Sequence, residues 1–78
     1  MNRQQLETIV LATLAVILKC ELSLDSSRKN TDQWDSLKHI EVIFALEDEF
    51  NIQFSEEEMG KLDSVSKIIE KVLAYHEA

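Results

Sequence analysis

The chain of 78 residues carries fifteen acidic and eight basic residues, which gives a formal net charge of −7 at pH 7. This acidity argues against nucleic acids and anionic membrane surfaces as partners, because both are bound by clusters of Lys and Arg. The length and the initial methionine predict one complete domain over residues 1–78 with a single modest core. The absence of Pro, the presence of one Gly and a 45% apolar content favour a globular helical fold.

Cysteine usage and apolar runs place the protein in a reducing, aqueous compartment. The single Cys20 cannot form an internal disulfide, which is typical of intracellular proteins. The apolar run from Ile9 to Leu18 is too short to span a bilayer, and no signal-peptide cleavage pattern follows it. We therefore expect a cytoplasmic monomer that does not bind membranes.

The first half of the chain predicts one helix followed by a long polar loop. A helix is expected over residues 3–19, with Asn2 as its N-cap. Its apolar face is formed by residues at spacings of three and four, namely Leu6, Ile9, Val10, Thr13, Leu14 and Ile17. Residues 23–33 contain one apolar residue, Leu24, so we expect a long loop there.

Three more helices are expected after this loop. Asp35 is the predicted N-cap of the second, which should end near Asn51 and bury Leu37, Ile40, Ile43, Phe44, Leu46 and Phe50. Ser55 and Glu58 form a capping box for a short third helix that extends to about Met59 or Lys61, with Gly60 expected to end it. Ser64 should cap the last helix, whose buried stripe comprises Val65, Ile68, Ile69, Val72 and Leu73, with Tyr75 closing it. The expected fold is an all-α bundle of three longer helices and one short helix.

The net charge is concentrated in one segment. Residues 35–58 contain eight of the fifteen acidic residues and Lys38 as the only base, so this segment alone accounts for the whole net charge. An acidic surface can serve solubility alone. Its asymmetry favours a docking face for partners with basic patches, because such a field steers the encounter of two proteins.

Ser36 directly follows the predicted N-cap and is the candidate functional residue. Its hydroxyl should lie near free backbone N–H groups at the positive end of a helix, where an attached anion is favoured. Ser36 and His39 could face the same way, but no acid behind His39 and no Gly-rich oxyanion loop accompany them, which argues against a hydrolase. The loop lacks the Gly and Glu of a calcium site, and His39, His76 and Cys20 lack ligand spacing, so we expect no metal and no catalytic residues.

Asp35-Ser36-Leu37, followed by an acidic amphipathic helix with the run Ala-Leu-Glu-Asp-Glu-Phe over residues 45–50, resembles the acyl carrier protein family. The resemblance covers the whole chain, including its length and the order of predicted helices. It implies that Ser36 accepts 4′-phosphopantetheine from coenzyme A through a separate phosphopantetheinyl transferase. The thiol of this arm would then hold an acyl group as a thioester and present it to successive enzymes, and the protein would not be an enzyme itself.

The resemblance also implies roles for residues near Ser36. Partner recognition would involve Trp34, Asp35, Leu37, Glu41, Glu47 and Asp48, which would meet the transferase and the basic patches of acyl- or aminoacyl-loading enzymes, acyltransferases and synthases. A groove between the second and third helices could shelter an acyl chain. Its candidate lining residues are Leu46, Phe50, Phe54 and Leu62, all of which could equally be ordinary core.

Trp34 stands where carriers of primary fatty acid synthesis usually have a small residue, and Lys38 and His39 replace the usual acids after the leucine. This form resembles discrete carriers of specialised pathways, such as polyketide, aminoacyl or polysaccharide building-block synthesis, although a fatty acid pathway remains open. Trp34 can also be interpreted as an anchor for the polar loop, and Lys38 and His39 as solvated residues. The alternative function is an unmodified acidic adaptor that binds a basic protein and uses Ser36 only at a helix start.

Overall fold

The computed structural model describes residues 2–77 and contains four helices. They are α1 (Arg3–Leu18), α2 (Ser36–Phe50), α3 (Glu56–Lys61) and α4 (Val65–Glu77). This confirms the predicted all-α bundle of three longer helices and one short helix. Between residues 2 and 77 there is no strand, and none of the helices has the length and apolar content that crossing a bilayer requires.

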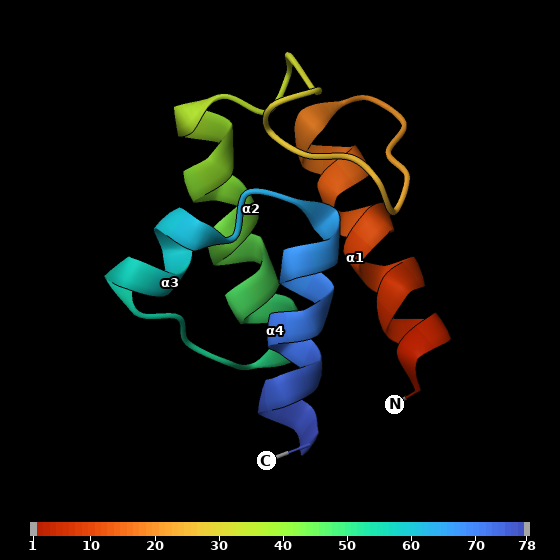
Figure 1. Ribbon diagram of the computed structural model, residues 1–78, viewed down its shortest axis with the longest axis vertical. Helices are drawn as coiled ribbons and strands as arrows, with labels where there is room; N and C mark the ends of the chain where they lie inside the picture. The colour runs from red at the N-terminus through yellow and green to blue at the C-terminus, as the bar shows by residue number, and fades with distance from the viewer. Residues whose placement is uncertain (1, 78) are drawn as a thin grey trace.

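The three longer helices lie side by side, and the two ends of the chain lie at the same end of the bundle (Figure 1). Helix α1 runs from that end toward the long loop, whereas α2 and α4 both run back. The short α3 lies against the side of the bundle away from α1. The long loop and the first turn of α2 therefore occupy the end opposite the termini.

Helices α1, α2 and α3 begin at the N-caps that the sequence predicts, and α2 also ends at the predicted residue. The side chain of Asn2 accepts a hydrogen bond from the backbone of Gln5 at 2.8 Å, and Ser55 and Glu58 form a reciprocal capping box. Asn51 ends α2 in the left-handed conformation with φ of 54°. Gly60 does not end α3 as predicted. It lies inside the helix without positive φ, because the helix continues to Lys61 before the chain turns into the core at Leu62.

The core is apolar and draws on all three longer helices. Helix α1 buries residues four apart, and α4 buries most of its predicted stripe; the buried residues are Leu6, Val10, Leu14 and Leu18 on α1 and Val65, Ile68, Ile69 and Val72 on α4. Helix α1 contacts both α2 and α4.

The buried face of α2 differs from the prediction. Leu37, Ile40 and Phe44 are 77%, 51% and 59% exposed, although their spacing suggested core positions. The face that packs inward instead comprises His39, Val42, Ile43, Leu46 and Phe50. Helix α2 has more apolar residues than one helical face can bury, and the face that packs inward includes His39, whose contacts are described below.

Backbone hydrogen bonds tie the long loop to the α3–α4 connection. The amide of Arg28 donates to the carbonyl of Asp63 at 2.9 Å, and the amide of Val65 donates to Ser26 at 3.0 Å. These bonds surround an isolated antiparallel bridge between Ser27 and Ser64. The loop is polar, as predicted, but it is fixed to the bundle at its middle.

Candidate functional site

Ser36 is the first residue of α2, and its side chain is exposed. The helix begins there because Asp35 has an extended backbone and its carboxylate accepts a hydrogen bond from the Lys38 amide at 2.9 Å. The Ser36 hydroxyl consequently lies at the helix start, where a second protein can reach it and where an attached anion meets the positive end of the helix dipole.

Trp34 fixes the segment that precedes Ser36. Its side chain is only 2% exposed and belongs to the core, and its amide donates to the Thr31 carbonyl at 3.0 Å. The expectation that Trp34 contacts partners is therefore wrong for this conformation, because a buried indole presents no surface to them. The alternative expectation, that Trp34 anchors the loop, agrees with the structure.

His39 is buried beside Trp34, in contrast to the prediction that it is solvated. The indole Nε1 of Trp34 donates to His39 Nδ1 at 3.0 Å, and His39 Nε2 lies 2.7 Å from the Met59 carbonyl oxygen. An indole nitrogen can only donate, so Nδ1 must accept and Nε2 must carry the proton that it shares with Met59. Both ring nitrogens are occupied, and His39 has none available to act as a base for Ser36.

Arg28 approaches Ser36 from the long loop. Its Nη2 atom lies 3.3 Å from Ser36 Oγ, and its Nε donates to the Trp34 carbonyl at 3.4 Å. Sequence reasoning missed this residue, because a contact between positions eight apart across a polar loop leaves no local pattern. An exposed hydroxyl with a cation beside it suits the attachment of an anionic group.

The outer face of α2 forms an exposed strip of three apolar residues, Leu37, Ile40 and Phe44, next to two exposed acids, Glu41 and Asp48. Leu37, Glu41 and Asp48 were expected to meet partners. Ile40 and Phe44 were expected in the core. The signal that could have found them is a second apolar stripe at spacings of three and four on the same helix.

Glu47 lies apart from this strip. Its carboxylate is half-buried and accepts a hydrogen bond from the Phe54 amide at 2.7 Å. The Glu47 carbonyl also accepts from the Ile52 amide at 3.1 Å. Glu47 therefore holds the connection between α2 and α3, whereas Asp48 and Glu41 are exposed and Glu41 pairs with Lys38 at 3.2 Å on the surface of α2.

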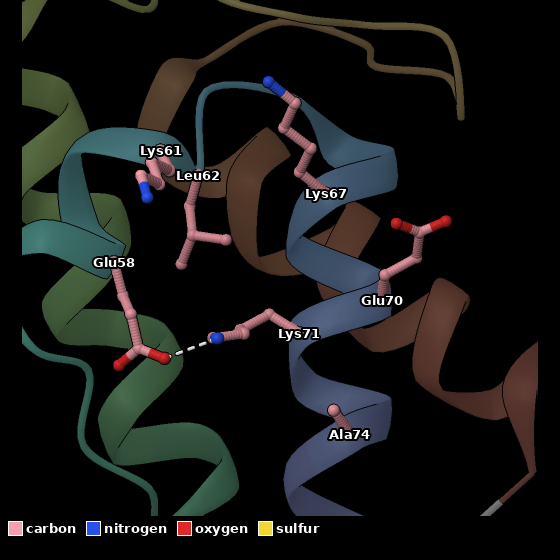
Figure 2. A pocket seen from close by; sticks show the side chains of 7 residues that line it. All are labelled: Glu58, Lys61, Leu62, Lys67, Glu70, Lys71 and Ala74. Atoms are coloured by element: carbon pink, nitrogen blue, oxygen red, sulfur yellow. Dashed lines mark ion pairs between the residues drawn. The ribbon is translucent and has the colours of Figure 1, made fainter.

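The four candidate groove residues, Leu46, Phe50, Phe54 and Leu62, are at most 6% exposed and pack as core. A pocket of about 410 Å³ lies between α3 and α4, but among these four only Leu62 lines it (Figure 2). The rest of its lining is charged apart from Ala74. Sheltering of an acyl chain stays a prediction, since the candidate residues would have to separate to admit one.

Glu58 joins α3 to α4 at the edge of this pocket. It pairs with Lys71, as the dashed line in Figure 2 shows, and it accepts a hydrogen bond from the hydroxyl of Tyr75 at 3.1 Å. The hydrogen bond from Lys71, followed by that from Ser55, lowers the pKa of Glu58 from 4.5 to about 2. The same pairing raises the pKa of Lys71. Among residues 2–77, no group of three or more potential metal ligands gathers here or elsewhere.

Comparisons with known proteins identify the family of the chain. No family model matches the chain. The acyl carrier protein of Clostridium acetobutylicum is 37% identical over 57 residues, which cover 73% of this chain and 74% of that protein. The acyl carrier protein of Buchnera aphidicola from Acyrthosiphon pisum is 50% identical over 36 residues, 46% of this chain and 45% of that protein. The extent of the first match, together with the four-helix bundle, shows that the chain belongs to the acyl carrier protein family.

Proposed function

We propose that the protein carries acyl groups as thioesters on a 4′-phosphopantetheine arm attached to Ser36, and that it presents them to other enzymes without catalysing a reaction itself. The observation that carries the proposal is the position of Ser36, exposed at the first residue of α2 in a member of this family. Tethering the cargo supports this role because it gives the cargo a high effective concentration at each partner.

Attachment would be performed by a phosphopantetheinyl transferase. The Ser36 oxygen forms a bond to the β-phosphorus of coenzyme A, the pyrophosphate bond breaks, 3′,5′-ADP leaves, and the hydroxyl proton passes to a base of the transferase. This chain supplies an accessible hydroxyl at a fixed place, because Asp35 caps the helix and Trp34 anchors the preceding loop. His39 takes no part, since its ring nitrogens bond to Trp34 and Met59.

Docking of the transferase and of later partners would use the exposed strip of α2. Its apolar side chains can be buried by a partner, and its acids can meet basic residues around the contact. Such contacts give fast, salt-sensitive and reversible binding, which a carrier that visits several enzymes requires. Asp35 and Ser36 lie at the end of this strip, so a partner bound there would be beside the arm.

For the pathway, we propose a specialised one, such as polyketide, aminoacyl or polysaccharide building-block synthesis, in preference to primary fatty acid synthesis. The buried pair of Trp34 and His39 supports this preference, because both residues depart from the usual sequence around Asp-Ser-Leu. The partners would be loading enzymes, acyltransferases or synthases with basic patches.

Intact mass spectrometry tests the function. The protein is incubated with coenzyme A, Mg²⁺ and a broad-specificity transferase, and one phosphopantetheine adduct is expected on the wild type and none on Ser36→Ala. The matched control is Ser66→Ala, which removes another exposed helix serine and should leave the adduct intact. An unmodified wild type would instead support the acidic adaptor, and an adduct on Ser36→Ala would place the attachment elsewhere.

A further inference from the structure

We propose that Arg28 binds the phosphodiester that links the arm to Ser36 and thereby positions the first atoms of the arm. This inference rests on the proposed function and adds to it a residue that positions the arm. Arg28 lies eight residues before Ser36, outside the Asp-Ser-Leu motif.

The guanidinium of Arg28 lies beside Ser36 Oγ, but the hydrogen bonds that it makes there are long. Its contacts with Ser36 Oγ and the Trp34 carbonyl are 3.3 and 3.4 Å, at the long end for such bonds. A guanidinium has five N–H donors, so three are not used by these contacts. None of the ion pairs among residues 2–77 involves Arg28, so no carboxylate of the described residues neutralises it.

The position of Arg28 is fixed by its backbone. Its amide donates to the Asp63 carbonyl at 2.9 Å, and the neighbouring Ser26 carbonyl accepts from Val65 at 3.0 Å. The side chain is half-buried, whereas that of the next residue, Lys29, is exposed. Little further ordering is therefore required when Arg28 meets a ligand at Ser36, which favours binding.

A phosphodiester on Ser36 would give Arg28 the partner that it lacks. Attachment replaces a neutral hydroxyl by a phosphodiester whose anionic oxygens lie two bonds beyond Ser36 Oγ, within reach of the remaining N–H donors. Charge-assisted bonds of this kind are shorter and stronger than bonds to a hydroxyl, and the planar fork of Arg suits phosphate better than the point charge of Lys. The contact would restrain the first atoms of the arm.

The test compares the melting temperature of the unmodified and modified forms for the wild type, Arg28→Gln, Arg28→Lys and Lys29→Gln. The gain in Tm on modification should be about 2–4 °C smaller in Arg28→Gln than in the wild type, which is the scale of one exposed ion pair in a domain of this size. Lys29→Gln changes the same net charge at the adjacent position and should keep the wild-type gain, and Arg28→Lys should keep part of it. The ³¹P resonance of the modified protein should shift in Arg28→Gln and not in Lys29→Gln.

A purely structural role for Arg28 predicts a different pattern. Arg28→Gln would then lower the Tm of both forms equally and leave the ³¹P resonance unchanged, and this result would overturn the inference. Mass spectrometry of each sample separates the two proposals. A wild type that the transferase leaves unmodified contradicts the proposed function, whereas complete modification with no Arg28-dependent difference contradicts only the role of Arg28.

Discussion

The hydrogen bonds of His39 should make a large contribution to stability, which replacement by leucine can measure. His39→Leu keeps a side chain of suitable size at a position that is 7% exposed, but it removes both bonding partners. The indole N–H of Trp34, 2% exposed, then has no acceptor, and the Met59 carbonyl has no donor. A buried donor or acceptor without a partner costs about 1–3 kcal/mol.

The expected loss in the free energy of unfolding is about 2–3 kcal/mol. The cost at Trp34 should be near the middle of that range because its side chain is buried, and the cost at Met59 should be smaller because that residue is half-buried and water can reach it. The loss would lower Tm by roughly 8–20 °C in a domain of this size. Urea unfolding followed by far-ultraviolet circular dichroism measures it, with exposed Lys67→Leu on α4 as a surface control.

A double-mutant cycle with Trp34→Phe isolates the bond between the two rings. Trp34→Phe leaves His39 Nδ1 without its donor, and His39→Leu leaves Trp34 Nε1 without its acceptor, whereas the double change removes this donor and acceptor together. The double variant should therefore lose less than the sum of the single losses, by about 1–2 kcal/mol. Additive losses, or a His39→Leu protein as stable as the wild type, would refute the hydrogen-bond network described here.

Three further predictions concern the exposed strip of α2, the ion pair of Glu58 and the acidic residues of the segment 35–58. Phe44→Ser should weaken binding of the transferase and slow modification, with little change in stability. The control Val16→Ser changes an apolar residue that is 77% exposed on α1 and should alter neither binding nor modification. Binding assays measure the first effect, and Tm checks that both variants remain stable. Glu58→Gln should lower stability at pH 7, and the difference from the wild type should vanish as pH falls from about 4.5 to 2, because the pKa of this carboxyl is lowered in the fold and its contribution is lost on protonation. Added salt or divalent cations should raise Tm by screening the acids of residues 35–58, and a Tm indifferent to both would show that their repulsion is negligible.

The limits of the helices could be predicted because their causes are local. A cap acts within three residues, so Asn2, Asp35 and Ser55 can be recognised from their immediate neighbours. The left-handed end at Asn51 is of the same kind. The exposed position of Ser36 could be predicted for this reason, since it follows directly from the cap at Asp35.

The rotation of α2 about its axis could not be predicted from local pattern alone. The helix carries two apolar stripes, and the sequence does not say which stripe meets the bundle. The inner face includes His39, whose partners are Met59, twenty residues later, and the buried Trp34. Because His39 is interpreted from the sequence as solvated, the local pattern offers no reason to assign it to the inner face.

The pairing of the long loop with the chain before α4 could not be predicted from the sequence either. Its residues are polar, and nothing in their spacing indicates that the middle of the loop pairs with the chain before α4. The contact of Arg28 with Ser36 depends on that pairing. Contacts between distant polar segments leave no periodicity, and the structure was required to find them.

The two departures from the usual sequence around Ser36, namely Trp34 and His39, can be understood as one unit. A buried Trp needs an acceptor for its N–H, and His39 provides it from the next turn of α2. This bond holds positions 34 and 39 inward and, through the helical period, holds Leu37 outward, while Ser36 is exposed because it is the first residue of the helix. A tryptophan here without the histidine would carry the cost of an unpaired N–H. Relatives with Trp before Asp-Ser-Leu should therefore have His, or another side chain that can accept and donate, three residues after the serine, and frequent Trp with an apolar residue there would contradict this coupling.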